Sequence, residues 1–264
     1  MARLSRPEGV ELHWEEQNTG RAVVIVPHWS GHPRMFEPLT RDLGRDHRVV
    51  AYHLRGTGES TRVGPYDAET DAGDLEAVLT AAEAEGVVAV ANADAANHAI
   101  RVAVRRPDLV NAVVISTANP IGPSAVAGAD EALSGSRAVL DALLGLIETS
   151  YRTGLRALLG GLDSHADDPS VQSRIDETVS FCEAEAAVGR LRAWINDPPT
   201  PETHTLGDRL WWLTSENNPW FPRDLEQRLS EVLPDAHVEH ADDGPVNRPD
   251  LTAAVVRRIT TAGP

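Results

Sequence analysis

The chain has 264 residues, with no lysine, a single cysteine (Cys182) and only 5% aromatic residues. One cysteine excludes an internal disulfide and any metal site built from a cluster of cysteines. No run of about 18 apolar residues occurs, and residues 1–16 lack the apolar region of a secretion signal. We therefore expect a soluble, cytoplasmic protein without a membrane segment.

The charge balance is strongly acidic. Arginine supplies all 24 basic residues against 40 Asp and Glu, which gives a net charge of −16. A surface of that sign repels phosphate backbones and anionic lipids, so we predict that neither nucleic acid nor a membrane surface is a partner. The length fits one large domain, or one domain with an insertion. The oligomeric state stays open, with a homodimer as one option.

Short apolar runs alternate with amphipathic stretches in the first half, which is typical of the strands and helices of a parallel sheet. After Asn119 a loop rich in Gly, Pro and Ser leads into Ala-, Leu- and Glu-rich stretches without a strand-like run. We predict a core of residues 1–118 and 202–264 and a helical cap of residues 119–201 over the carboxyl ends of the strands, where open α/β sheets bind ligands. The expected strands are 22–26, 48–54, 87–90, 112–116, 210–213 and 236–240, and the expected core helices are 33–43, 68–85, 95–105, 223–233 and 249–260.

Three short segments add a more specific signal. Residues 28–31 read His-Trp-Ser-Gly, residues 53–60 read His-Leu-Arg-Gly-Thr-Gly-Glu-Ser, and residues 218–220 read Asn-Pro-Trp. In order and spacing they resemble the oxyanion loop, the second turn and the acid loop of the α/β-hydrolase fold with a helical cap. The resemblance covers nearly the whole chain and implies a mostly parallel central sheet flanked by helices. Trp29 stands where that family has glycine, and His53 where it has aspartate.

Family members that hydrolyse esters carry their nucleophile on a strand-to-helix elbow, Gly-x-Ser-x-Gly. Residues 90–97 read Val-Ala-Asn-Ala-Asp-Ala-Ala-Asn at this point. Counting back from Arg106 and Pro107 places Ala93 at the nucleophile position, and a shift of one residue places Asp94 there. We favour Ala93, which has no nucleophilic atom.

The other two positions of the catalytic triad also depart from the family pattern. The acid position reads Asn218, and counting back from Arg248 puts Asp242 at the histidine position. The nearest histidine, His240, falls in the expected strand and reaches the pocket only if the strand register shifts. We therefore predict that the chain does not hydrolyse esters or amides by a serine mechanism.

Two carboxylates are the predicted catalytic groups. If Asp94 faces Asp242 beneath the cap, one of the two keeps its proton near neutral pH, and the pair supplies a general acid and a general base. The competing interpretation makes Asp94 a helix N-terminal residue and Asp242 a solvated turn residue. We expect the backbone N–H groups of Ser30 and Asp94 to face a ligand oxygen. The predicted substrate-binding residues are His28, Trp29, Ser30, Ala93, Asn218 and Trp220.

Three functions fit this pattern. The leading one is a non-hydrolytic enzyme of small-molecule, secondary metabolism that catalyses an isomerisation, cyclisation or elimination on a largely apolar substrate. The second is a catalytically silent binding or partner protein that keeps the fold. The third is a hydrolase with Asp94 as nucleophile, similar to epoxide hydrolases and dehalogenases. We expect no metal, because no two histidines show a ligand spacing alongside carboxylates, and no cofactor.

Overall fold

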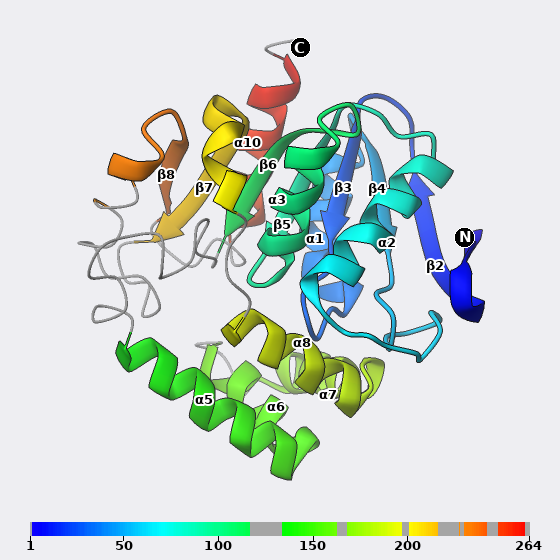
Figure 1. Ribbon diagram of the computed structural model, residues 1–264, viewed down its shortest axis with the longest axis vertical. Helices are drawn as coiled ribbons and strands as arrows, with labels where there is room; N and C mark the ends of the chain where they lie inside the picture. The colour runs from blue at the N-terminus through cyan, green and yellow to red at the C-terminus, as the bar shows by residue number, and fades with distance from the viewer. Residues whose placement is uncertain are drawn as a thin grey trace.

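The computed structural model describes residues 2–116, 134–162, 168–196, 201–215, 227, 230–241 and 248–261. Within these ranges eight strands form one sheet in the order β1-β2-β4-β3-β5-β6-β7-β8 (Figure 1). The pairs β1/β2 and β2/β4 are antiparallel, and every pair from β4 to β8 is parallel. The predicted fold class is confirmed. The strands are β1 (Ala2–Arg6), β2 (Val10–Gln17), β3 (Ala22–Val26), β4 (Arg48–Tyr52), β5 (Val87–Asn92), β6 (Val110–Ser116), β7 (Leu210–Ser215) and β8 (His237–Ala241).

The central strands are continuous apolar runs, whereas the first two strands are not. All six residues of β5 are buried, as a parallel strand covered on both faces requires. In β1, partly buried and exposed residues alternate. The apolar runs of the sequence did not indicate β1 and β2, because the strands at this end of the sheet have an exposed face and contain few apolar residues.

Helices cover both faces of the sheet. The helices α2 (Ala68–Ala81) and α3 (Ala95–Arg105) pack on one face through side chains such as Leu75 and Ile100. The helices α1 (Glu37–Leu43) and α10 (Pro249–Thr261) pack on the other face. Short 3-10 helices are η1 (Pro7–Gly9), η2 (Pro33–Phe36) and η4 (Pro201–Arg209).

Four α-helices lie between β6 and β7 in the described part of the chain, before η4, and we call them the inserted helices. They are α5 (Ser134–Thr149), α6 (Tyr151–Leu162), α7 (Pro169–Phe181) and α8 (Ala184–Asn196). They lie together below the sheet in Figure 1 and enclose a small core of their own, which includes Ile147, Leu155 and Leu191. The division of the chain at residues 118/119 and 201/202 stays a prediction.

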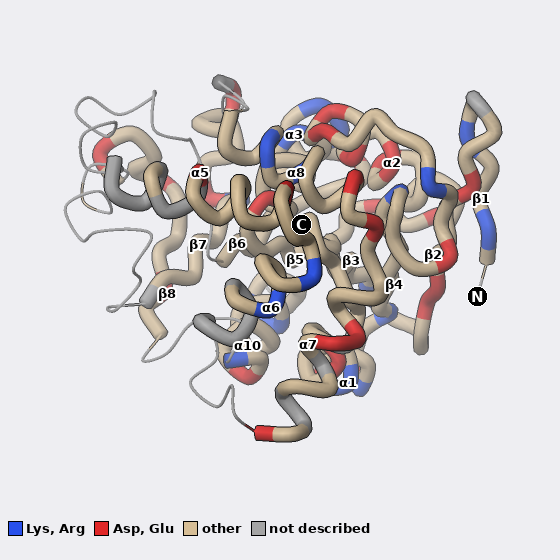
Figure 2. Tube along the Cα trace, turned by 90° about the horizontal axis from the view of Figure 1, so that it is seen from below, with Lys and Arg blue, Asp and Glu red and all other residues tan. Residues whose placement is uncertain are grey.

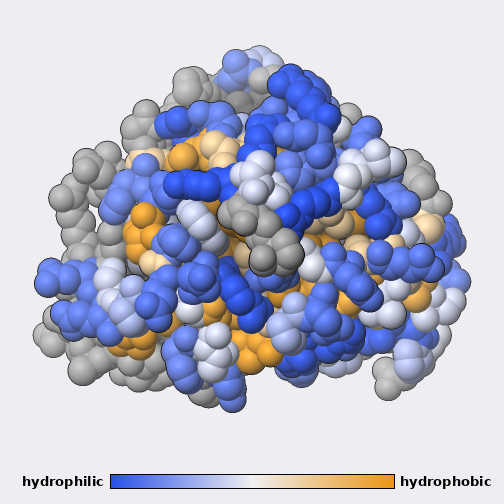
Figure 3. Space-filling model, turned by 90° about the horizontal axis from the view of Figure 1, so that it is seen from above, coloured by the Kyte–Doolittle hydropathy of each residue, from blue (hydrophilic) through white to orange (hydrophobic). Residues whose placement is uncertain are grey.

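The surface carries both signs of charge. Acidic and basic residues lie side by side along the core helices (Figure 2), for example where Arg105 and Arg106 pair with Glu76. On the face turned away from the inserted helices, hydrophobic residues show only in small separate places among hydrophilic ones (Figure 3). None of the helices in the described ranges combines the length and the apolar content that crossing a bilayer requires.

Candidate active site

The chain turns sharply between β5 and α3. Ala93 lies in this turn with a φ of 53°, in the left-handed region that an alanine enters at a cost of about 1–2 kcal/mol. Its N–H donates a hydrogen bond to the carbonyl oxygen of Ser116, 3.0 Å away, which ties the turn to the end of β6. The strained residue of the elbow is therefore Ala93, and Asp94 follows it at the start of α3.

The carboxyl group of Asp94 is buried directly behind this elbow. Its Oδ1 accepts a hydrogen bond of 2.9 Å from the backbone N–H of Trp29. Burial raises the pKa of the Asp94 carboxyl to about 7, although the hydrogen bond from Trp29 acts in the opposite direction. Near neutral pH the group is therefore divided between a proton donor and a proton acceptor.

The loop after β3 brings one N–H group to the elbow. The N–H that faces the elbow belongs to Trp29, whereas the N–H of Ser30 donates to His28 Nδ1 at 3.4 Å. The N–H of Ser30 thus already has a partner within the loop, which continues through Gly31 with a φ of 23°, and the expectation that Ser30 faces a ligand oxygen stays a prediction. Burial, followed by the charge of His98, lowers the pKa of His28 to about 4, so this imidazole is neutral and organises the loop.

The indole of Trp29 does not line either cavity described below. It is buried among the inserted helices, in the same cluster as Leu155 and Leu191. A large apolar ring gains more from this packing than from an open pocket, since burial removes its surface from water.

A polar cavity lies between α2, α3 and α8. It leaves about 10 Å³ for the centre of a water molecule. The residues that line this polar cavity are Ala68, Asp71, Asp94, Asn97, His98, Arg190, Ala193 and Trp194. Arg190 of α8 donates from Nε and Nη2 to the two oxygens of Asp71 on α2, at 2.6 and 2.8 Å. His98 Nδ1 lies 3.7 Å from Asp71 Oδ2.

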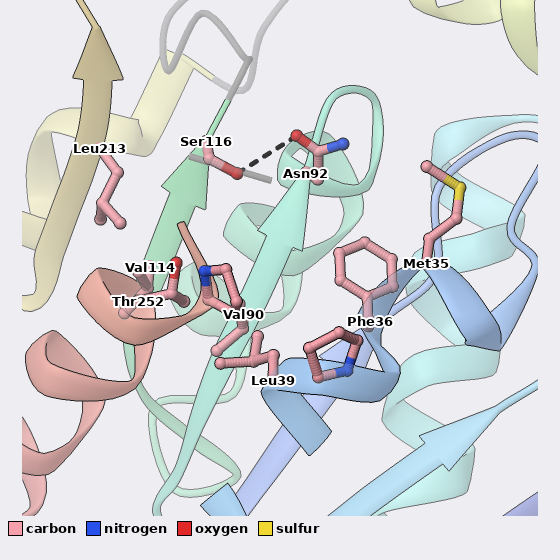
Figure 4. Close-up of a pocket in the computed structure, with 11 residues that line it drawn as sticks. Met35, Phe36, Leu39, Val90, Asn92, Val114, Ser116, Leu213 and Thr252 are labelled. Atoms are coloured by element: carbon pink, nitrogen blue, oxygen red, sulfur yellow. Dashed lines mark hydrogen bonds between the residues drawn. The ribbon is translucent and has the colours of Figure 1, made fainter. Parts of the chain in front are cut away.

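A second pocket, which we call the apolar pocket, opens on the other side of β5 (Figure 4). It has a volume of about 30 Å³. Asn92 and Ser116 stand at one end of it, joined by a hydrogen bond of 3.2 Å from the Ser116 hydroxyl to Asn92 Oδ1. The remaining lining residues are Met35, Phe36, Pro38, Leu39, Val90, Val114, Leu213, Pro249 and Thr252.

Several predicted site residues are not brought to the elbow. Asp242, Asn218 and Trp220 lie outside the described residues, so the facing pair of Asp94 and Asp242 stays a prediction. His240 is exposed on β8, with β6 and β7 between it and β5, a separation of three strand spacings or ~14 Å. It lines neither cavity, and its predicted optional role in substrate binding finds no support in this position.

Three members of the polar cavity were not among the predicted site residues: Asp71, His98 and Arg190. Asp94 and His98 are four residues apart on a helix, which puts them on one face, and this signal was present in the sequence. Arg190 offered no comparable signal, since only the packing of α8 on the core brings it to Asp71. Within the described ranges no three His, Cys, Asp or Glu side chains gather as metal ligands.

A sequence profile described as the alpha/beta hydrolase family matches residues 23–255. The chain belongs to this family. Alpha/beta hydrolases carry a nucleophile on a strand-to-helix elbow and bind an oxyanion beside it. That Ala93 and the loop at Trp29 occupy these two positions stays a prediction.

Solved structures of similar shape include esterases and lactonases. An esterase from Exiguobacterium antarcticum has a TM-score of 0.78 and 15% identity, with 98% of each chain covered. A carboxylesterase of Nitrososphaera gargenis has a TM-score of 0.76 and 16% identity, covering 99% of this chain and 98% of the other. An enol-lactonase from Burkholderia xenovorans has a TM-score of 0.68 and 18% identity, with 96% of each chain covered.

A further similarity concerns part of the chain. An 87-residue stretch, 33% of this alpha/beta hydrolase, is 32% identical to a polyketide synthase of Burkholderia thailandensis and spans 4% of that protein.

These comparisons correct the leading functional prediction. The similar structures named above are hydrolases, and none of them isomerises, cyclises or eliminates according to its description. The prediction of a non-hydrolytic isomerisation, cyclisation or elimination is wrong. It rested on reading the loss of a serine nucleophile as the loss of hydrolysis, although a carboxylate can also promote attack by water.

Proposed function

We propose that this alpha/beta hydrolase cleaves a small, largely apolar carboxylic ester or lactone, and that Asp94 handles the proton in place of a serine and histidine. One observation carries the proposal. The buried carboxyl of Asp94 directly follows the elbow, has one oxygen fixed by the Trp29 N–H, and lines a cavity of the size of a water molecule.

The geometry supports a general base more than a covalent nucleophile. The turn of the elbow belongs to Ala93, and the Asp94 backbone is already helical, with φ of −61° and ψ of −25°. The carboxyl is therefore held beside the place from which a nucleophile attacks. A pKa of about 7 suits a general base at neutral pH, because the group is both sufficiently ionised and sufficiently basic.

The reaction balances with water as the co-substrate. The carboxylate of Asp94 takes a proton from the water molecule while the water oxygen forms a bond to the carbonyl carbon. The carbonyl oxygen then carries the negative charge, next to the free N–H groups at the start of α3. When the tetrahedral intermediate collapses, the ester C–O bond breaks and Asp94 returns the proton to the leaving alkoxide. The products are a carboxylic acid and an alcohol.

The substrate class follows from the surroundings of the elbow. The apolar pocket beside Asn92 offers alkyl and aromatic walls and few polar groups, which favours an apolar acyl or alkyl portion. The partial similarity to a polyketide synthase supports a substrate drawn from secondary metabolism.

Hydrolysis of 4-nitrophenyl esters and aliphatic lactones of increasing chain length tests the proposal. Asp94→Asn should lower kcat by about 100-fold or more, a share typical of acid–base groups. Asp108→Asn, which changes an exposed aspartate, serves as the matched control and should keep the wild-type rate. Wild-type protein that releases no product from any of these substrates, or Asp94→Asn at full rate, contradicts the proposal.

Isotope labelling separates the general base from the nucleophile. After a single turnover in ¹⁸O-water, a general base leaves the label only in the product acid. A nucleophilic Asp94 would expel the alkoxide and form a mixed anhydride with the acyl group, and water that opens this anhydride at the Asp94 carbon places the label in the Asp94 carboxyl group. Label in the Asp94 peptide, detected by mass spectrometry, therefore identifies a nucleophile.

One observation favours a second candidate, the silent binding protein. The Trp29 N–H, which faces the position of an oxyanion, is already occupied by the Asp94 side chain. A silent binder would take up an apolar ester, seen as a rise in Tm or as heat in calorimetry, and would leave it uncleaved.

A further inference from the structure

The polar cavity contains buried polar atoms without partners. Arg190 Nη1 has no hydrogen-bond partner among the described residues. The imidazole of His98 interacts with the backbone of Pro27, which leaves one of its two ring nitrogens without a partner among the described residues. Arg190 is 2% exposed and His98 1% exposed, so bulk water does not reach them. An unsatisfied buried polar atom costs about 1–3 kcal/mol, and more for a charged group, so native proteins nearly always supply a partner.

A second buried pair shows that an arginine–aspartate contact does not by itself leave an arginine nitrogen without a partner. Arg55 donates to both oxygens of Asp74, at 2.6 and 2.9 Å, and Arg6 adds a further bond to the same carboxylate. Asp74 lies one helical turn after Asp71 on α2. Neither Arg55 nor Asp74 has a buried atom without a partner, whereas Arg190 has one that lines a cavity.

The size and the charge of the cavity identify its occupant. About 10 Å³ for the centre of a water molecule meets the lower limit for holding one water. The charge of Arg190 is already balanced by Asp71, so no net positive charge is left to attract an anion. A neutral molecule that both donates and accepts hydrogen bonds fits the donor Arg190 and the acceptor Asp94 at once.

We propose that the polar cavity holds one water molecule, bound by Arg190 Nη1, His98 and the Asp94 carboxyl, and that this is the water that attacks the substrate. The second half of the statement rests on the proposed hydrolytic function, whereas the first half does not. Arg190 donates to the water oxygen, which leaves both water protons directed at acceptors on Asp94 and His98. Such an arrangement orients a lone pair and a transferable proton before substrate binds.

A high-resolution crystal structure of the unliganded protein tests the water site. The expected result is one ordered water within hydrogen-bond distance of Arg190 Nη1 and of Asp94 or His98. His98→Leu should remove or displace the water, and His98→Gln, which keeps a polar group, should retain it. His13→Leu is the matched control, since His13 is also buried but lies on β2 and not at the cavity. An empty cavity, or an Arg190 Nη1 bonded to a protein atom, overturns the proposal.

Kinetics then test the role of the water. His98→Leu should lower kcat by about ten-fold or more with KM within about two-fold, and His98→Gln should recover part of the loss. A water in the crystal structure without any turnover upholds the site and overturns its catalytic role together with the proposed function. Hydrolysis that depends on Asp94 while the cavity is empty upholds the function and overturns the water site.

Discussion

The two sides of the elbow differ in kind. On one side Asn92 faces the apolar pocket, where its only polar neighbour drawn in Figure 4 is Ser116. On the other side Asp94 faces the polar cavity, together with Asp71, His98 and Arg190. A single turn, with Ala93 in its middle, thus separates an apolar space from a charged one.

This difference assigns different tasks to the two sides. An apolar pocket with a satisfied hydrogen bond contributes binding through shape and burial, and it moves no protons. The polar cavity can handle protons. Burial raises the pKa of Asp94 to about 7 and lowers the pKa of His98 to about 4, so the carboxyl can exchange a proton near neutral pH while the imidazole stays neutral. Among the described residues, the inserted helices line the polar cavity, through Arg190, Ala193 and Trp194 of α8, and do not line the apolar pocket.

We expect the largest effect from a substitution that removes the ion pair on the polar side of the elbow. Arg190→Met leaves the charge of Asp71 buried without its partner, so the free energy of unfolding in urea should fall by about 3–5 kcal/mol. Arg192→Met, on the same helix, breaks a pair with Glu148 in which the arginine side chain is 59% exposed. That control should cost less than about 1 kcal/mol. Equal losses for both variants would mean that the inserted helix does not depend on the buried pair.

The next effect concerns the pH dependence of stability. The folded-state pKa of Asp94, about 7, is raised above its ordinary value of 3.8, so the folded state binds the extra proton between these values. Its contribution to stability is fully present below about pH 4 and is lost as the pH rises through about 7. Asp94→Asn removes this loss. Between pH 4 and pH 8, the free energy of unfolding of the variant should therefore rise by a few kcal/mol relative to that of the wild type.

Urea unfolding of both proteins at pH 5 and pH 8 measures this gain. Burial lowers the pKa values of His28 and His98 to about 4, so their contribution to the stability of the protein has the opposite pH dependence and is lost as the pH falls. Both histidines are present in both proteins, so their contribution cancels in the difference. A difference that does not change with pH would show that Asp94 is ionised and well solvated.

The sequence predicted the strands and the elbow around the site better than it predicted the residues that line the polar cavity. The runs of Val and Ala in β3, β5 and β6 indicated a parallel sheet, because such strands are buried on both faces. The small residues around Ala93 indicated the elbow, since only such residues allow a strand and a helix to approach so closely. Both features are local, and a local pattern is visible in a sequence.

The contents of the polar cavity depend on contacts that no local pattern records. Arg190 meets Asp71 across 119 residues, and the Trp29 N–H meets Asp94 across 65. The exposed or buried state of an arginine cannot be read from its neighbours on a polar helix, because packing against α2 decides it. The sequence also contained no sign that the N–H of Trp29 bonds to Asp94, since that contact depends on how the loop after β3 folds.

The smallest expected effect tests the boundary between the two sides. Ala93→Gly relieves the left-handed strain but loses a methyl contact and adds unfolded-state entropy, so stability should stay within about 0.5 kcal/mol of the wild type. Ala99→Gly makes the same change in the interior of α3, where no strain is relieved, and should cost about 1 kcal/mol or more. Urea unfolding of the two variants compares them directly. If Ala93→Gly costs as much as Ala99→Gly, the elbow is unstrained, and the sharp turn that places Asn92 and Asp94 on opposite sides is not where we locate it.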